Sequence, residues 1–271
     1  MSLPITFLSD YGNADEFAGV CRAVIARVAP ALEVIDLTHA IAPFDIAAGA
    51  AALARALPYC PSAVHLAVVD PGVGGARRSL AIAAVEGRHL FVGPDNGLLV
   101  AALELCGGAA AAVAIKPPPP GTPVGFDGRD VFAPAAAHLA VARDLQALGD
   151  PIDPATIVRL PVVVLRLEPD RIATEVASID RFGNIALKLS AAELAAHPLG
   201  ELAELVVCHG DQARRVRRAR AFSEVSLGEP LLHADSSGSA AIAINQGRAA
   251  DHFGAGAGAK VGQPITLEPP R

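Results

Sequence analysis

The sequence is poor in the residues that build disulfide-rich or metal-stapled folds. Its 271 residues include four cysteines, and no two of them are close enough to form a C-x-x-C pair. The eight histidines show no spacing typical of metal ligands. Because disulfide frameworks and zinc sites draw on closely spaced cysteines and histidines, the sequence predicts reduced thiols and no metal site. We therefore expect a cytoplasmic protein.

Long hydrophobic runs and excess positive charge are also missing. No apolar stretch approaches the roughly 20 residues of a membrane-spanning helix, and the first residues lack the basic leader of a secretory signal. The net charge is −6, which disfavours non-specific binding to nucleic acid or to an anionic membrane. The arginine-rich run at 214–220 is best interpreted as a solvated edge. We expect neither nucleic acid nor a membrane as a partner.

Complete cofactor motifs are absent as well. The turn containing Gly72 and Gly74 lacks the third glycine of a dinucleotide fingerprint, since Arg77 occupies that position. The run from Gly254 to Lys260 lacks both the Gly-Lys pair and the following hydroxyl residue of a phosphate loop, so we interpret it as a flexible turn. The sequence therefore predicts no bound cofactor.

The chain is rich in hydrophobic residues, and its predicted strands alternate with helices. Hydrophobic residues make up 52% and charged residues 18%, which excludes disorder and suggests that partner subunits cover some apolar surface. Up to about residue 155, short strands alternate with helices, the last helix being expected over Val131–Leu148. This alternation predicts a doubly wound, mostly parallel sheet in an α/β domain over residues 1–155. From Val162 onward, short strand-like segments predict a smaller, mostly antiparallel β domain over residues 156–271.

One stretch stands out as a candidate site. The apolar run Val64–Val69 predicts a buried parallel strand, and Asp70 follows at its carboxyl end. Open α/β sheets bind ligands at such ends, and the glycines that follow allow the backbone to approach a ligand closely. Arg77 is near enough to fold back and face Asp70. The alternative interpretation is ordinary turn chemistry with solvated arginines.

Other polar residues fall at comparable positions. Asp10 and Asp95 also end strands or enter glycine turns, although aspartate is a common turn former. Asp180, Phe182 and Asn184 combine a carboxylate, an aromatic face and a carboxamide, a set that suits a purine and also suits a β-turn. A turn at Ser236 offers small donors that suit a carboxylate and are equally typical of an ordinary turn.

Taken together, these segments resemble a known family. The order LSDYG, IDLTHAIAPFD, VVDPGVGG, VGPDNG, GFDGRD, IDRFGN and IAINQG is similar to that of the S-adenosylmethionine hydrolases, or hydroxide adenosyltransferases. That family is related to the fluorinating and chlorinating enzymes, which attack the same sulfonium substrate. The resemblance covers nearly the whole chain. It implies an α/β domain, a carboxy-terminal β-barrel-like domain, and a homotrimer whose active sites lie between subunits.

The resemblance also implies a role for individual residues. Asp10 would hold the ribose hydroxyls beside Phe44, and Asp180 and Ser236 would take the methionine ammonium and carboxylate. The adenine would be framed by Phe182, Asn184, Phe222 and the backbone after Asn245. Asp70 and Arg77 match two members of an Asp-Arg-His set that positions the attacking water or hydroxide, with S-adenosylmethionine as substrate and no cofactor.

The third member of that set does not match. Asp127 stands where the hydrolases usually have histidine. Two carboxylates facing one water would repel each other and make one a better base, with Arg77 limiting the effect, so hydrolysis is the expected activity. The alternative is that added negative charge disfavours hydroxide and leaves a non-catalytic binding protein. A halide transferase is disfavoured, because Asp70 would repel a halide.

Overall fold

The computed structural model describes residues 2–119, 121, 123–161, 165–210, 212–253 and 259–270. The chain divides into two compact units, Met1–Leu160 and Pro161–Arg271. The beginning of the strand expected from Val162 and most of the turn expected at Gly254–Lys260 lie outside the described residues. None of the helices in the described part of the chain has the length and apolar character needed to cross a lipid bilayer.

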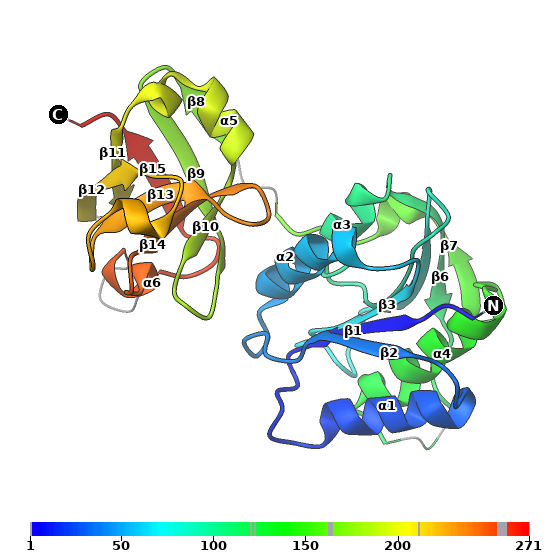
Figure 1. Ribbon diagram of the computed structural model, residues 1–271. Helices are drawn as coiled ribbons and strands as arrows, with labels where there is room; N and C mark the ends of the chain where they lie inside the picture. Colours follow the sequence, from blue (N-terminus) through cyan, green and yellow to red (C-terminus); the bar gives the residue numbers. More distant parts are fainter. Residues whose placement is uncertain are drawn as a thin grey trace. The chain divides into compact units, whose positions relative to one another are not determined.

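The first unit is a sheet covered by helices on both faces (Figure 1). Its elements in chain order are β1 (Ile5–Ser9), α1 (Phe17–Val28), β2 (Val34–Thr38), α2 (Ile46–Ala56), β3 (Val64–Val68), β4 (Ser79–Ala84), β5 (Leu90–Pro94), α3 (Val100–Leu105), β6 (Ala109–Ile115), α4 (Ala133–Ala142) and β7 (Gly149–Ile152), with 3-10 turns at Leu57–Tyr59 and Pro154–Thr156 and a π-helical turn at Gly128–Phe132. The strand order is β2-β1-β3-β5-β4-β6-β7.

The sheet explains the hydrophobic pattern of its central strands. Strands β1, β3 and β5 are buried along their whole length because helices cover both faces. The core below one face packs against α1 and α4, and the core of the other face packs against α2 and α3. Pairing is parallel from β2 to β5 and antiparallel from β5 through β4 and β6 to β7. The predicted α/β class is confirmed.

One predicted helix is too long. The expected helix over Val131–Leu148 ends at Ala142, and Arg143 adopts a left-handed backbone conformation with φ 56°. Asp144 then accepts hydrogen bonds from the backbone of the following turn, at Gln146 and Ala147. The apolar pattern continues past Ala142, but those residues belong to a turn that leads into β7. Local hydrogen bonding by aspartate ended the helix where composition alone did not.

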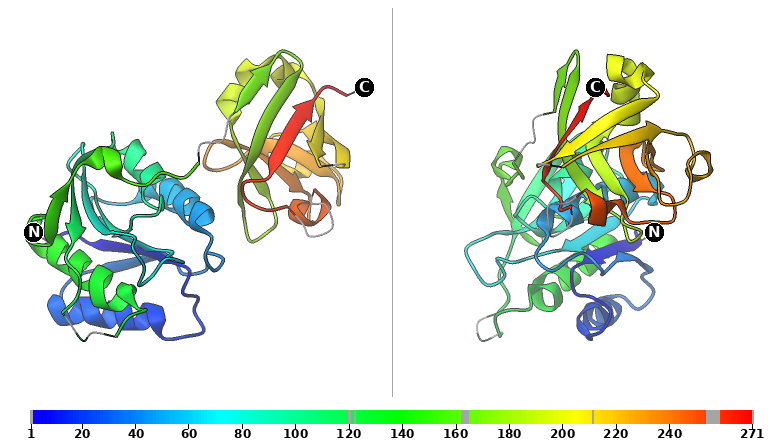
Figure 2. Two further views of the ribbon diagram at one scale, coloured as in Figure 1. Left: turned by 180° about the vertical axis from the view of Figure 1, so that it is seen from behind. Right: turned by 90° about the vertical axis from the view of Figure 1, so that its left-hand side faces the viewer.

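The second unit is a closed β-barrel with short helices. Its elements are β8 (Arg166–Glu168), β9 (Arg171–Ile179), β10 (Ile185–Ser190), α5 (Ala191–Ala196), β11 (Glu204–His209), β12 (Gln212–Arg218), β13 (Pro230–Ala234), β14 (Ser239–Ile244), α6 (Ala249–His252) and β15 (Pro264–Glu268), with 3-10 turns at Pro198–Glu201 and Phe222–Glu224. Pairing between β9 and β10 closes the sheet, and β8 lies outside the ring as a hairpin partner of β9. Figure 2 shows β15, in red, beside the green strand β9.

Alternation along the strands builds the barrel core. In β9, buried residues such as Ile172 and Val176 alternate with more exposed ones, and β11 shows the same period. The pairings are antiparallel except for a short parallel contact between β12 and β13. The arginine-rich run falls on β12, where Arg214 and Arg215 are exposed as predicted. It is not a sheet edge, because β12 pairs with strands on both sides.

Candidate active site

The carboxyl ends of two adjacent strands bring the first candidate residues together. Strands β1 and β3 pair in parallel, with Ser9 opposite Val68, so Asp10 and Asp70 leave the sheet at the same edge. They border a cavity of about 270 Å³ within the first unit. Its lining residues are Asp10, Tyr11, Phe17, Pro43, Phe44, Val68, Asp70, Val73, Gly125, Phe126, Asp127 and Gly128. The strand-end position predicted for a ligand site therefore coincides with a cavity.

Two carboxylates share one guanidinium beside this cavity. Arg77 Nε donates to both carboxylate oxygens of Asp70, at 3.0 Å each, and Nη2 donates to Asp70 and to Asp127. Its remaining nitrogen, Nη1, donates to Ser79 Oγ at 2.8 Å. The side chains of Asp70, Arg77 and Asp127 retain only 6, 12 and 18% of their exposure. The arginine is thus held from three directions and has little freedom to turn.

The charge of this cluster is unbalanced. Burial alone would lower the pKa of Arg77, but the hydrogen bonds and charges of Asp70 and Asp127 outweigh that effect and raise it. The guanidinium, which also lies 5.2 Å above the ring of Phe132, therefore stays charged. One positive charge against two carboxylates leaves a net negative charge facing the cavity. Such a site can orient a water molecule and accept its proton.

Asp127 reaches the cluster from a part of the chain that is 50 residues distant from Arg77. It immediately precedes the π-helical turn that opens α4, a tight segment that requires a glycine next. A Cβ on Gly128 would lie 2.0 Å from the hydroxyl oxygen of Tyr11, so no larger residue fits without displacing that ring. From this turn, Asp127 Oδ2 accepts the hydrogen bond of Arg77 Nη2.

An aromatic wall was not assigned a role from the sequence. The ring of Tyr11 lies 5.9 Å from that of Phe17 and 5.7 Å from that of Phe126, and Phe17 and Phe126 are 5.1 Å apart. Burial, with smaller contributions from nearby acidic groups, raises the pKa of Tyr11, so its hydroxyl stays protonated. Tyr11 and Phe126 are direct neighbours of Asp10 and Asp127 in the recognised motifs, which was the available signal.

Asp10 is fixed by a loop contact. Its Oδ2 accepts a hydrogen bond from the backbone nitrogen of Phe44 at 2.9 Å. Phe44 has a left-handed φ of 68°, and 70% of its surface is exposed. A large aromatic side chain in a strained backbone conformation at a cavity rim is typical of a ligand contact. Within the described residues, no hydrogen bond reaches the other oxygen of Asp10, which can therefore accept one from a hydroxyl.

Asp95 has a different role from the other strand-end aspartates. Its Oδ2 accepts from Arg78 Nε at 2.6 Å, and its Oδ1 accepts from the backbone nitrogen of Val158 at 2.8 Å. Arg78 also donates to Thr156. Asp95 is buried and fully bonded, and it holds the segment after β7 against the sheet. It is a structural residue.

In the second unit, aromatic side chains gather at another cavity. Its volume is about 530 Å³, and Phe182, Asn184 and Phe222 line it together with Arg181, Ile244, Gln246, Gly247 and Arg248. Phe182 is 74% exposed, which leaves a ring face open to a planar ligand. The three residues assigned to adenine by resemblance are thus brought together within this unit.

The other three residues predicted to contact the substrate in this unit are Asp180, Asn245 and Ser236, and none of them lines this cavity. Both carboxylate oxygens of Asp180 accept hydrogen bonds from Asn184, one from its backbone at 2.8 Å and one from its side chain at 2.7 Å. Asn245 points toward the loop that carries Phe222, donating to Val225 O at 2.9 Å, while the residues after it line the cavity. Ser236 is exposed in a turn and is not a lining residue.

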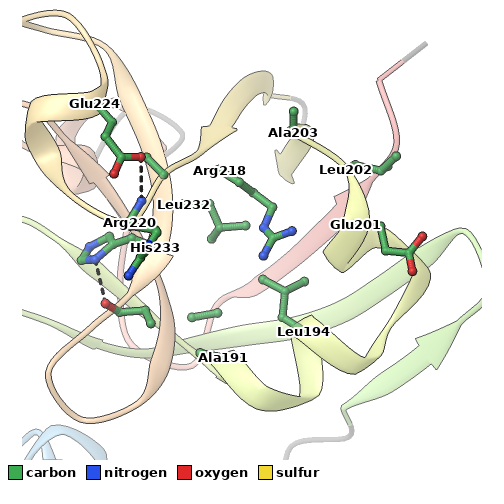
Figure 3. Close-up of a pocket in the computed structure, with 13 residues that line it drawn as sticks. Ala191, Leu194, Glu201, Leu202, Ala203, Arg218, Arg220, Glu224, Leu232 and His233 are labelled. Carbon is green, nitrogen blue, oxygen red and sulfur yellow. Dashed lines mark hydrogen bonds between the residues drawn. The ribbon is translucent and has the colours of Figure 1, made fainter.

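A third cavity, of about 570 Å³, lies on the barrel and contains none of the predicted site residues (Figure 3). Arg218 projects between Leu194 and Leu232, while Arg220 and His233 border one side. The backbone nitrogen of Arg220 donates to Glu224. This cavity is separate from the one that contains Phe182, Asn184 and Phe222.

Comparison with known proteins identifies the family. The sequence profile of the SAM hydroxide adenosyltransferase N-terminal domain matches residues 5–149, and that of the C-terminal domain of the same family matches residues 174–262. A protein from Salinispora tropica named (R)-S-adenosyl-L-methionine hydrolase is 47% identical, over 92% of this chain and 93% of its own length. One of the same name from Thermus thermophilus is 42% identical, over 97% and 99%.

More distant relatives and a solved structure complete the comparison. A fluorinase from an Actinoplanes species is 24% identical over 89% of this chain and 90% of its own. The crystal structure of an uncharacterized conserved protein from Thermotoga maritima superimposes with a TM-score of 0.87 at 33% identity, covering 97% of this chain and 99% of that one. The similarity therefore extends across both units.

Proposed function

The chain belongs to the SAM hydroxide adenosyltransferase family, and from that premise we propose that it hydrolyses S-adenosyl-L-methionine to adenosine and L-methionine. The observation that carries the proposal is the Asp70–Arg77–Asp127 cluster beside the cavity at the carboxyl ends of β1 and β3. This cluster supplies an oriented base.

The reaction needs no acid. The oxygen of water forms a bond to the ribose 5′ carbon while the bond from that carbon to sulfur breaks, and its electron pair stays on sulfur. Methionine leaves as a neutral thioether, and the proton of the water passes to the carboxylate pair and then to solvent. Because water is a poor nucleophile, holding it in line is the main task of the protein.

Asp127 takes the position of the family's usual histidine in this proposal. Since Arg77 is already neutralised by one carboxylate, the second is left to attract the proton of the water. The buried negative charge also argues against halide transfer, because an anion would be repelled from the place where it must attack. Relatives that are 42% and 47% identical are named as hydrolases, which favours catalysis over a purely binding role.

The substrate contacts follow the cavities of each unit. We assign the ribose hydroxyls to Asp10, with Phe44 beside the sugar, and the adenine to Phe182, Asn184 and Phe222. The methionine ammonium is assigned to Asp180 and the carboxylate to Ser236, two roles that rest on the family resemblance. The named relatives specify the R configuration at sulfur, so we assign that epimer as the preferred substrate.

The proposal includes a homotrimer in which a second subunit completes each active site. It is tested by mixing two inactive variants, Asp70→Ala and Asn184→Ala, under conditions of subunit exchange. If each site draws on two subunits, about a quarter of the sites in a 1:1 mixture regain both intact halves. Activity no higher than that of either variant would contradict shared sites, and light scattering gives the oligomeric state.

We also propose a cytoplasmic location for the protein, because its four free cysteines favour a reducing compartment.

A chromatographic assay tests the activity itself. Purified protein is incubated separately with the R and S epimers, with and without chloride, and the products are separated. We expect adenosine and methionine in equal amounts, no halogenated adenosine, and loss of product in Asp70→Ala. Retention of intact substrate without adenosine at any pH would instead show a binding protein. A large rate increase in Asp127→His would show that the native aspartate is a degraded catalytic residue.

A further inference from the structure

Three side chains with metal-binding atoms converge at the end of the first unit's sheet that is opposite to the catalytic cavity. Glu86 and His89 lie in the turn between β4 and β5, and Cys106 directly follows α3. Their ligand atoms all lie within 4.8 Å of one another. Since 17 residues separate His89 from Cys106, sequence spacing did not predict this group, and only the fold brings it together.

The separation between the carboxylate and the imidazole matches that of a tetrahedral zinc site. Glu86 Oε1 lies 3.3 Å from His89 Nε2. With metal bonds of about 2.0–2.1 Å to nitrogen and oxygen, the tetrahedral angle places such atoms about 3.3–3.4 Å apart. With a zinc–sulfur bond of about 2.3 Å, sulfur would lie about 3.6 Å from either atom. The structure holds Cys106 Sγ within 4.8 Å of both atoms, so zinc binding would draw the thiol inward.

A buried relay fixes the ring of His89 in the orientation that a metal needs. His89 Nδ1 lies 2.8 Å from His65 Nε2, and His65 Nδ1 lies 2.7 Å from Thr6 Oγ1. When His65 Nδ1 donates to the hydroxyl oxygen of Thr6, His65 Nε2 is left to accept the proton of His89 Nδ1. That tautomer leaves the lone pair of His89 Nε2 directed at Glu86 and Cys106. Metal-bound histidines characteristically donate a hydrogen bond from the N–H of their second ring nitrogen.

The surroundings of the group suit a site with one open side. His89 and Cys106 are buried, whereas Glu86 is partly exposed and can adjust. Its other oxygen, Oε2, faces the exposed Arg88 at 3.3 Å, which leaves Oε1 toward His89. The backbone nitrogen of Glu86 donates to Cys106 O at 3.3 Å. This hydrogen bond holds the β4–β5 turn against the end of α3 before any ion binds.

We propose that Glu86, His89 and Cys106 form a structural site for one Zn²⁺ ion, with water as the fourth ligand. A thiolate, an imidazole and a carboxylate together favour zinc over the hard cations magnesium and calcium. Binding replaces the thiol proton of Cys106, which leaves to solvent, and no other bond changes. The ion would tie the β4–β5 turn to the end of α3. Because Asp70 lies past the opposite end of β3 from His65, the site is separate from the catalytic cluster.

The test uses the full chain, stripped with a chelator and titrated with Zn²⁺ by calorimetry, then with Co²⁺ by absorption spectroscopy. We expect one ion per chain, a thiolate-to-cobalt charge-transfer band, and a melting temperature that rises with zinc. Cys106→Ser and His89→Gln should weaken binding by about 100-fold or more. Cys60→Ser is the matched control, because its thiol is bonded to Ala56 O elsewhere in the unit, and it should bind zinc normally.

Glu86→Gln keeps the test decisive if the buried variants do not fold. Its side chain is partly exposed, so the variant should fold and hydrolyse substrate normally while binding zinc about tenfold more weakly. The proposal is wrong if the wild type shows no saturable binding, if the cobalt complex lacks the thiolate band, or if Glu86→Gln binds zinc as tightly as the wild type. In those cases the three side chains form only a hydrogen-bonded cluster.

Discussion

Replacing Asp127 by asparagine tests the central chemical argument. The change removes one carboxylate from a cluster in which two of them share the guanidinium of Arg77. The asparagine oxygen can still accept the hydrogen bond from Arg77 Nη2, so the geometry should persist. What disappears is the unbalanced negative charge that attracts the proton of the water. Asp127→Asn therefore separates charge from position.

The expected loss follows from the role of a base. Proton transfer by a positioned side chain contributes about 10²–10⁴-fold to a rate. Because Asp70 remains, we expect the lower end, a fall in kcat of about 100-fold, which corresponds to about 2.7 kcal/mol of barrier. KM should change little, since Asp127 is not among the residues proposed to hold the nucleoside. Stability should fall by no more than about 1 kcal/mol because the hydrogen bond is retained.

The same turn offers a matched control. Asp130 receives two hydrogen bonds of 2.7 Å from Arg129 and does not line the cavity. Asp130→Asn removes a carboxylate of the same kind, three residues away, and should leave kcat unchanged. Initial rates of adenosine release give kcat and KM, and thermal denaturation checks the fold. A kcat for Asp127→Asn within about threefold of the wild type would refute the role of the second carboxylate.

Three further changes probe the walls of the two cavities. Gly128→Ala puts a methyl group 2.0 Å from the Tyr11 hydroxyl oxygen, so we expect a loss of about 1–3 kcal/mol in denaturant unfolding and lower activity; unchanged stability would contradict the tight contact. Phe182→Ala removes a side chain that is 74% exposed, so the melting temperature should hold while KM rises about tenfold through lost stacking. Asp10→Asn keeps an acceptor for Phe44 N but loses its charge, and KM should rise about tenfold with kcat less affected; a fall in kcat alone would move Asp10 into the chemical step.

Much of the architecture could be predicted because its signals are local. The buried run of β3 and the alternation of strands with helices predicted the α/β unit and placed Asp70 at a strand end. Parallel strands end at one edge, so Asp10 and Asp70 could be expected near each other. Helix length was less predictable, since the end of α4 depends on how Arg143 and Asp144 turn the chain.

Contacts between segments that are distant in the sequence could be identified only from the tertiary structure. The apolar periodicity of single strands predicted a β domain, but the pairing of β9 with β10 that closes the barrel is a choice among many partners. Likewise, the sequence showed that Asp127 replaces the family's usual histidine, but it left open whether the Asp127 side chain faces the site. The structure places it on Arg77, 50 residues away in sequence.

By itself, the sequence determined the alternation of strands and helices in the first unit, which aspartate ends the central strand, and which family the chain resembles. These properties are read from neighbouring residues, because burial on one face or both leaves a pattern within a few positions. Tertiary structure alone decided that Asp127 shares a guanidinium with Asp70 and that Glu86, His89 and Cys106 converge. These contacts depend on how separate helices and strands pack. Packing brings together residues whose spacing along the chain does not indicate that they are neighbours.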